Sequence, residues 1–300
     1  MKIRLVWLLL CCIWGSTWLF IKLGLQDLPP LTFAGIRFVI ACTILTSLII
    51  ARRIALPSRA RDWFLLALTG VLSFTLNYGL LFWGEQYISS GLAALLQATI
   101  PAFGLIIAHF HLPGEQLTGT KILGVVVGVL GVAIIFSNQL SVSGPGALAG
   151  SVALVIGSIC VAYSNVLVKA HGQKLNPAIL AAGQMFFGLI PLLVIGIPLE
   201  GNPFHFHWTT MSIVALFYLA IVGTVIAFLM YYWLVHHMDV TKTMLISLVT
   251  PGIAVILGLL ILQEELSWRI FAGGTMIISG IALIVLRRFR KQEVEFASTG

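Results

Sequence analysis

Charged residues are scarce in this sequence. Only 9% of its 300 residues are Asp, Glu, Lys or Arg, whereas 59% are hydrophobic. A soluble globular domain carries roughly 25% charged residues to keep its surface in water. The composition therefore excludes a soluble enzyme or binding domain and predicts a polytopic membrane protein.

Carboxylates are especially few, and none of the ten Asp and Glu residues falls in the middle of an apolar run. A proton relay inside a membrane usually needs one. We therefore predict that no mid-membrane carboxylate drives this protein. That leaves facilitated flow, or coupling through groups near the helix ends.

Catalytic and metal-binding patterns are also lacking. The four cysteines lie in apolar runs, with no disulfide framework or metal spacing. There is no P-loop, Gly-x-Ser-x-Gly or nucleotide fingerprint, and the His236 to Asp239 interval is too short for an acyltransferase signature. We expect no catalytic residue, metal or cofactor, although an enzyme that uses this loop on lipid head groups stays an alternative.

Apolar runs make up most of the chain, and each of ten is long enough to cross a bilayer as a helix. They are Leu5–Leu25, Leu31–Ala51, Trp63–Gly84, Ser89–His111, Gly119–Ser137, Ala147–Lys169, Pro177–Leu199, Trp208–Val235, Thr241–Leu262 and Trp268–Leu286. The connections are too short to hold a soluble domain. The predicted fold class is an all-α integral membrane protein with ten transmembrane helices.

Lys and Arg gather in alternate loops. With the amino terminus inside, only Lys22, Arg37 and Arg269 fall toward the outer side. This bias is the one that orients membrane helices. Both termini are therefore predicted to be cytoplasmic, and the net charge of +7 is not interpreted as nucleic-acid binding.

The chain repeats itself in two halves. Pro101 lies near the middle of the fourth run, and an offset of 150 residues carries it onto Pro251. Each mid-span proline is expected to break its helix and free a backbone carbonyl. Because each repeat contains five spans, an odd number, the second half is inserted upside down relative to the first. The predicted domains are residues 1–140, the inverted residues 141–291 and a cytoplasmic tail at 292–300. Paired interruptions in inverted halves point to a transport site at their interface.

Polar and aromatic side chains within the spans are the candidates for a substrate pathway. Polar groups are costly in lipid and tend to face a cavity, and aromatic rings can stack on an apolar or aromatic substrate. With the two prolines, the set is Trp14, Trp18, Asn77, Tyr78, Gln97, Thr99, Pro101, Tyr163, Asn165, Ser247, Thr250 and Pro251. Hydrogen bonding between helices without any substrate is the alternative for each polar residue.

Two cations, Lys22 and Arg37, flank the expected outer ends of the first two helices. Long basic side chains in such places can snorkel to water. Alternatively, one of them attracts a carboxylate or phosphate at a charged mouth, with Glu85 or Glu265 as its resting partner.

Glycines recur at helical spacing in the fifth and tenth helices. Such faces allow close helix packing in lipid. They indicate either internal packing or a dimer contact, so we expect a monomer or a homodimer through these two helices. The other expected partners are membrane lipid and a small-molecule substrate.

These features together resemble a known family. The sequence Trp14-Gly15-Ser16-Thr17-Trp18 leading to Lys22, then Arg37-Phe38, Pro101 with Glu115 after it, and the Pro251/Glu265 copy are similar to the EamA-like ten-helix exporters of the drug/metabolite transporter superfamily. The second half departs from the pattern: no Trp-Gly pair lies near Tyr163, and Gln184 corresponds to Arg37.

The resemblance implies a secondary transporter of the bacterial inner membrane that exports small metabolites by alternating access. Amino acids, in particular aromatic or other apolar ones, are the preferred substrates, because no mid-membrane carboxylate is available to neutralise a permanent cation. Efflux of cationic drugs is the alternative.

Overall fold

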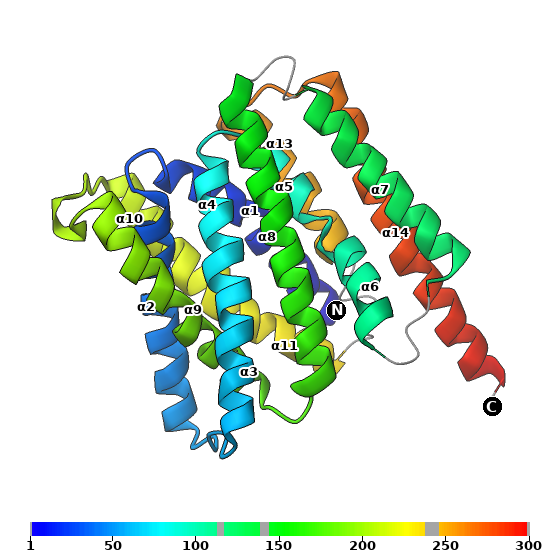
Figure 1. Cartoon of the computed structure of the whole chain (residues 1–300), viewed down its shortest axis with the longest axis horizontal. Helices are drawn as coiled ribbons and strands as arrows, with labels where there is room; N and C mark the ends of the chain where they lie inside the picture. Colours follow the sequence, from blue (N-terminus) through cyan, green and yellow to red (C-terminus); the bar gives the residue numbers. More distant parts are fainter. Residues whose placement is uncertain (1, 113–116, 139–143, 238–245, 299–300) are drawn as a thin grey trace.

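The computed structural model describes residues 2–112, 117–138, 144–237 and 246–298, with side chains except at 138, 144–145, 232, 235–236 and 284–298. Every regular element within these residues is helical (Figure 1). Thr241, Asp239 and Glu115 from the sequence analysis lie outside the described residues.

The helices follow the ten apolar runs closely. The first half contains α1 (Lys2–Gly24), α2 (Pro30–Ala51), a third span made of α3 (Ala60–Gly70), η1 (Val71–Asn77) and α4 (Tyr78–Glu85), a fourth made of α5 (Ser90–Gln97) and α6 (Ile100–His111), and α7 (Gly119–Asn138). The second half contains α8 (Gly144–His171), α9 (Pro177–Glu200), the short η3 (Pro203–His205), a span made of α10 (Thr210–Phe217), η4 (Tyr218–Ile226) and α11 (Ala227–His237), then α13 (Ile246–Ile261) and α14 (Trp268–Ser298).

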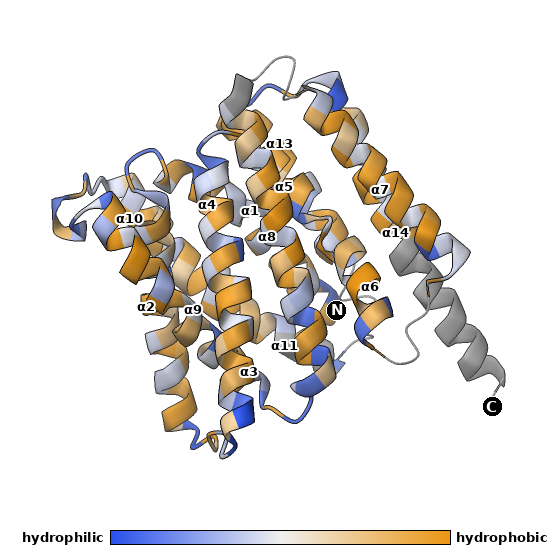
Figure 2. Cartoon of the chain, in the orientation of Figure 1, coloured by the Kyte–Doolittle hydropathy of each residue, from blue (hydrophilic) through white to orange (hydrophobic). Residues whose placement is uncertain are grey.

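The lengths and polarity of these helices are those of a multi-pass membrane protein. Eight helical stretches among the described residues have at least 18 residues and are apolar enough to cross a bilayer, and α13 and Trp268–Leu283 are shorter apolar helices. Hydrophobic residues cover most of the helical surface, and hydrophilic ones concentrate toward helix ends and loops (Figure 2). A helix pairs its own backbone N–H and C=O groups by hydrogen bonds, which is necessary because lipid offers no hydrogen-bond partners.

The internal repeat is visible in how the helices pack. α1 packs against α13, and its counterpart α8 packs against α6. Likewise α9 packs against α3 and η1, while α2 packs against α10 and η4. The pairs α2 with α9 and α7 with α14 each join a helix to its own counterpart.

Two π-helices sit at equivalent places in the third and eighth spans. η1 spans Val71–Asn77 and η4 spans Tyr218–Ile226, and the repeat offset of 150 carries η1 onto residues 221–227, which overlap η4. Thr75 in η1 donates a hydrogen bond to the Gly188 carbonyl at 2.6 Å, and Thr224 in η4 donates to the Leu219 carbonyl at 2.8 Å. Hydropathy predicted the spans but not the π-helices, which often mark functional sites.

The two repeated prolines behave differently. Pro101 is the second residue of a new helix, α6. The preceding helix α5 ends at Gln97, and in the turn between them the Thr99 hydroxyl donates a hydrogen bond to the Leu96 carbonyl at 2.6 Å. This break was predicted. Pro251 lies inside the continuous helix α13, so the expectation that it also breaks its helix is wrong. Neighbouring helices can accommodate a proline within a transmembrane helix.

The glycine faces of the fifth and tenth spans pack on each other within one chain. α7 and α14 run side by side at one edge of the molecule (Figure 1). A Cβ added to Gly131 would lie 2.5 Å from the Gly273 carbonyl oxygen, and one added to Gly280 would lie 2.4 Å from that of Gly124. The two backbones therefore touch, as small residues permit in lipid.

We expect Gly280→Ala to destabilise this helix pair. Its methyl group would collide with backbone that cannot move aside, a change that typically costs about 1–3 kcal/mol. Thermal unfolding of the detergent-purified protein measures the effect. Gly128→Ala on α7 is the matched control, because a Cβ there meets nothing within 4 Å. Equal unfolding temperatures for the two variants would contradict the close contact.

Candidate functional site

The Lys22 side chain links the end of α1 to the turn between α4 and α5 by hydrogen bonds. Its ammonium donates hydrogen bonds to the carbonyl of Glu85 at 2.6 Å and to that of Ile88 at 2.7 Å. These carbonyls lie at the carboxyl end of α4 and in the turn that follows, where helical partners run out. We call this part of the bundle the Lys22 end, and the opposite part, where α6 finishes, the His111 end.

A carboxylate at the same end holds the start of α5. Glu264, which precedes α14, accepts hydrogen bonds from the Ser90 backbone N–H at 2.7 Å, the Ser90 hydroxyl at 3.0 Å and the Gly91 N–H at 3.3 Å. A helix amino terminus has unpaired N–H groups and attracts negative charge. Its neighbour Glu265, which we expected to partner Lys22 or Arg37, has an exposed side chain.

A second carboxylate holds the start of α2 in the same way. Glu200, the last residue of α9, accepts hydrogen bonds from the Leu31 N–H at 2.8 Å and the Thr32 N–H at 2.7 Å, at the start of α2. In both places a carboxylate from one repeat caps a helix of the other. These contacts hold the two halves together at the Lys22 end.

Glu85 lies at the centre of this end. Its side chain is fully buried, and neither carboxyl oxygen has a hydrogen-bond partner among the described residues. The charges of Lys22, Glu264 and Arg37 all act on it. Sequence reasoning found Glu85 at a span end but not that it is buried.

Arg37 is buried in the interior of α2, with 3% of its surface exposed. Its Nε and one terminal nitrogen donate to the Thr224 hydroxyl at 3.2 and 3.0 Å, and the guanidinium carbon lies 5.3 Å from the centroids of the Phe38 and Tyr78 rings. The other terminal nitrogen has no partner among the described residues. Snorkelling of Arg37 to water is therefore wrong, because aromatic side chains enclose it.

Two of the expected pathway residues form a buried polar pair. The Gln97 side-chain nitrogen donates to the Asn77 side-chain oxygen at 2.9 Å, and both residues are buried. Asn77 ends the π-helix η1, and Gln97 ends α5 immediately before the turn at Thr99. The pair thus joins two irregular points of the backbone inside an apolar bundle.

The aromatic candidates of the first helix face the second half. The Trp14 ring lies 5.5 Å from that of Tyr231 and 6.3 Å from that of Phe228. Trp18 is partly buried and packs against both large core clusters. Trp14 therefore contacts the second half, and the role of both rings in a substrate pathway stays a prediction.

The ninth span touches the same part of the first helix. A Cβ added to Gly15 would lie 2.6 Å from the Ile253 side chain and 3.3 Å from the Thr250 carbonyl oxygen. Pro251 is buried, whereas Ser247 and Thr250 are partly buried.

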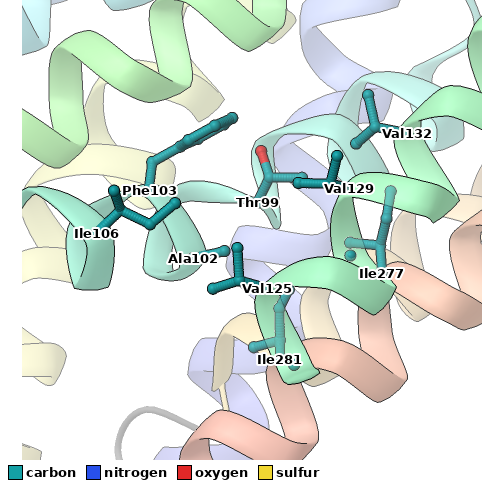
Figure 3. Close-up of a pocket in the computed structure, with 11 residues that line it drawn as sticks. Thr99, Ala102, Phe103, Ile106, Val125, Val129, Val132, Ile277 and Ile281 are labelled. Atoms are coloured by element: carbon teal, nitrogen blue, oxygen red, sulfur yellow. The ribbon is translucent and has the colours of Figure 1, made fainter. Parts of the chain in front are cut away.

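Three candidates lie apart from these groups. Tyr163 packs edge-on against His111, at a ring distance of 5.4 Å, and Asn165 is exposed. Thr99 lines an apolar pocket among α6, α7 and α14, together with residues such as Phe103 (Figure 3). This pocket has room for little more than a water molecule, about 20 Å³, so it does not accommodate a metabolite.

The two helices of the fourth span differ in how deeply they are buried. All of α5, at the Lys22 end, is buried, and it packs on α13. At the other end His109, Phe110 and His111 of α6 are exposed, as is Asn165 of α8. Among the described residues, no group of three or more His, Cys, Asp or Glu could hold a metal.

Sequence reasoning missed Glu264, Glu200 and Thr224. Ser89-Ser90-Gly91 and Pro29-Pro30 are recognisable helix starts, which could have suggested that an anion lies nearby. Choosing between Glu264 and Glu265 required the loop geometry. No sequence signal distinguishes Thr224 from the other span hydroxyls.

Comparison with known proteins gives consistent matches. A family model described as the EamA-like transporter family matches residues 2–137 and again 148–286, once for each half of the chain. The chain is 27% identical to the uncharacterized transporter YoaV of Bacillus subtilis, over 90% of this chain and 91% of that one. It is 29% identical to the uncharacterized inner membrane transporter YedA of Escherichia coli K12, over 92% and 88%.

A further relative carries a more specific name. The chain is 25% identical to a probable amino-acid metabolite efflux pump of Escherichia coli K12, over 95% of both chains. One solved crystal structure, described only as that of a protein, covers 96% of this chain and 98% of its own with a TM-score of 0.66 and 16% identity. That likeness concerns the fold alone.

Proposed function

Because the chain belongs to the EamA-like transporter family, we propose that it is a secondary transporter that exports small metabolites, and amino acids with aromatic or other apolar side chains in particular, by alternating access. The observation that carries this proposal is the buried Asn77–Gln97 pair, which links the π-helix η1 to the broken fourth span. A polar pair between two interruptions can rearrange as helices move and can offer hydrogen bonds to a solute.

The substrate class is supported by three observations. Trp14 with Phe228 and Tyr231 supplies aromatic surface between the repeats. The charges near the candidate site include Lys22 and Arg37, which disfavour a permanent cation. One relative is named a probable amino-acid metabolite efflux pump.

We also propose the orientation and the cellular location. The distribution of Lys and Arg supports cytoplasmic termini. With that orientation the Lys22 end faces outward, where the contacts of Glu264 and Glu200 join the two halves. The relative YedA is named an inner membrane transporter, and a bacterial inner membrane is the location proposed here. A homodimer, if formed, would use the exposed apolar face of α7 that includes Leu123, Val126 and Leu130.

Counterflow in proteoliposomes tests the function. Vesicles that contain the purified protein and unlabelled phenylalanine are expected to accumulate labelled phenylalanine transiently, because exchange through one carrier needs no energy source. Empty vesicles and vesicles loaded with glutamate are the controls. Counterflow of tetraphenylphosphonium without any amino acid would favour cationic drug efflux instead. Lipid turnover without solute flux would favour a lipid-modifying enzyme.

A further inference from the structure

We propose that Glu85 is a proton-binding site that locks the outer end of the carrier: the closed state holds its carboxyl as the neutral acid, and opening at the Lys22 end requires loss of that proton to water. This inference rests on the proposed transport function. The proton leaves the carboxyl oxygen as hydronium and leaves a carboxylate behind, so no oxidant or further reactant is involved.

The burial of Glu85 carries the first step. Its exposed fraction is 0%, and neither of its carboxyl oxygens has a hydrogen-bond partner among the described residues. An ionised carboxylate buried without hydrogen bonds is one of the costliest arrangements in a protein, whereas the neutral acid is much cheaper to bury. The closed state therefore favours a proton on Glu85.

The second argument concerns the nearby cations Lys22 and Arg37, whose described hydrogen bonds are made to groups other than the Glu85 carboxyl. Lys22 on α1 donates to the carbonyls of Glu85 and Ile88 rather than to a described carboxyl oxygen of Glu85. Arg37 on α2 uses two nitrogens on Thr224, and its third is unpartnered. The positive charges of both residues act on Glu85 and would stabilise its carboxylate if the surrounding contacts parted.

The other elements packed around Glu85 add one more charge. Glu264, before α14, acts on Glu85 and is itself occupied by the N–H groups of Ser90 and Gly91. Tyr78 on α4 lies beside Arg37. α5 has no charged residue, and those of α8 are confined to its far end at Lys169 and His171. A negative charge on Glu85 would be repelled by the negative charge of Glu264. This repulsion further favours the neutral acid of Glu85 while the Lys22 end is closed.

Opening would reverse these conditions. The turn between α4 and α5 is held by Lys22 on one side and by Glu264 on the other. Once these contacts part, water reaches the Glu85 carboxyl, and Lys22 and Arg37 are free to pair with its carboxylate. The lock therefore opens more readily at high pH than at low pH.

The test measures phenylalanine counterflow with equal pH on both sides of the membrane, so that no gradient contributes. In the wild type the rate is expected to rise with pH, by up to about tenfold per pH unit where the carboxyl is mostly protonated, and to level off once it is mostly ionised. Glu85→Gln is expected to be slow at every pH, since its side chain stays neutral. Glu85→Asp keeps a titratable group and the pH dependence. Glu265→Gln is the exposed matched control and behaves as wild type.

A second readout does not depend on transport. Infrared spectra of the purified protein are expected to show the carbonyl band of a buried neutral carboxyl that is missing from Glu85→Gln. Counterflow that ignores pH, or a fast Glu85→Gln carrier, would overturn the lock and leave the transport function standing. Absence of phenylalanine counterflow in the wild type would overturn the proposed export of aromatic amino acids, and absence of the infrared band would overturn the proton site by itself.

Discussion

A variant that combines Asn77→Leu and Gln97→Met is expected to unfold near the wild-type temperature and yet to lose phenylalanine counterflow by about tenfold or more, a change of about 1.4 kcal/mol or more in the transport barrier. Replacing both partners of a buried hydrogen bond by apolar groups of similar shape can be nearly neutral for stability. The Asn77–Gln97 bond would then be gone without leaving an unsatisfied atom. Any loss of flux reports the role of the pair in transport.

The single variants provide the contrast. Gln97→Met alone leaves the buried Asn77 oxygen without its donor, and an unsatisfied buried group costs about 1–3 kcal/mol. Both single variants are therefore expected to unfold at a lower temperature than the double variant. Thermal unfolding in detergent and counterflow in vesicles are measured on the same preparations. A double variant with wild-type flux would limit the pair to holding helices together.

The helices could be predicted from sequence because lipid imposes a simple rule. A spanning segment must satisfy its own backbone and present apolar side chains, so the runs Pro177–Leu199 and Gly119–Ser137 correspond to α9 and α7 with ends that differ by one residue. The inverted repeat followed from the prolines and basic residues. The equivalent packing of α1 on α13 and of α8 on α6 agrees with it.

The backbone irregularities could not be predicted in the same way. Pro101 and Pro251 occupy equivalent positions, but only the first ends a helix. Whether a proline breaks or merely interrupts a transmembrane helix depends on neighbours that can satisfy the freed carbonyl. In the turn before Pro101, the Thr99 hydroxyl donates to the Leu96 carbonyl. The π-helices have no signature in hydropathy, because an extra residue in a turn leaves the composition apolar.

The charged residues were predicted by type but not by environment. Arg37 is only seven residues into α2, which is close enough to the end for snorkelling to be expected, but the rings of Phe38 and Tyr78 enclose its guanidinium. Burial of such a group depends on side chains from three helices. Its partner Thr224 comes from the other repeat, so no local pattern could reveal it.

Glu264 and Glu265 give the sharpest test of the site, because they are adjacent and chemically identical. Glu264→Ala removes three acceptor contacts at the start of α5 and leaves the Ser90 and Gly91 N–H groups without their anion. Hydrogen bonds to charged groups contribute about 1.5–3 kcal/mol each. Because these three bonds share one partly buried carboxylate, their contributions are not additive, and we expect a total loss of about 1.5–3 kcal/mol.

Glu265→Ala is expected to leave stability within about 0.5 kcal/mol of wild type, as surface substitutions usually do, since its side chain is exposed. Thermal unfolding of both variants in the same detergent separates the two glutamates. Glu264→Gln distinguishes charge from hydrogen bonding, because the amide oxygen can still accept but cannot neutralise the positive end of the α5 dipole. If Glu265→Ala were the more damaging change, Glu265 would be the residue that caps the start of α5 in the folded carrier. The buried Glu85 would then have a different anionic neighbour.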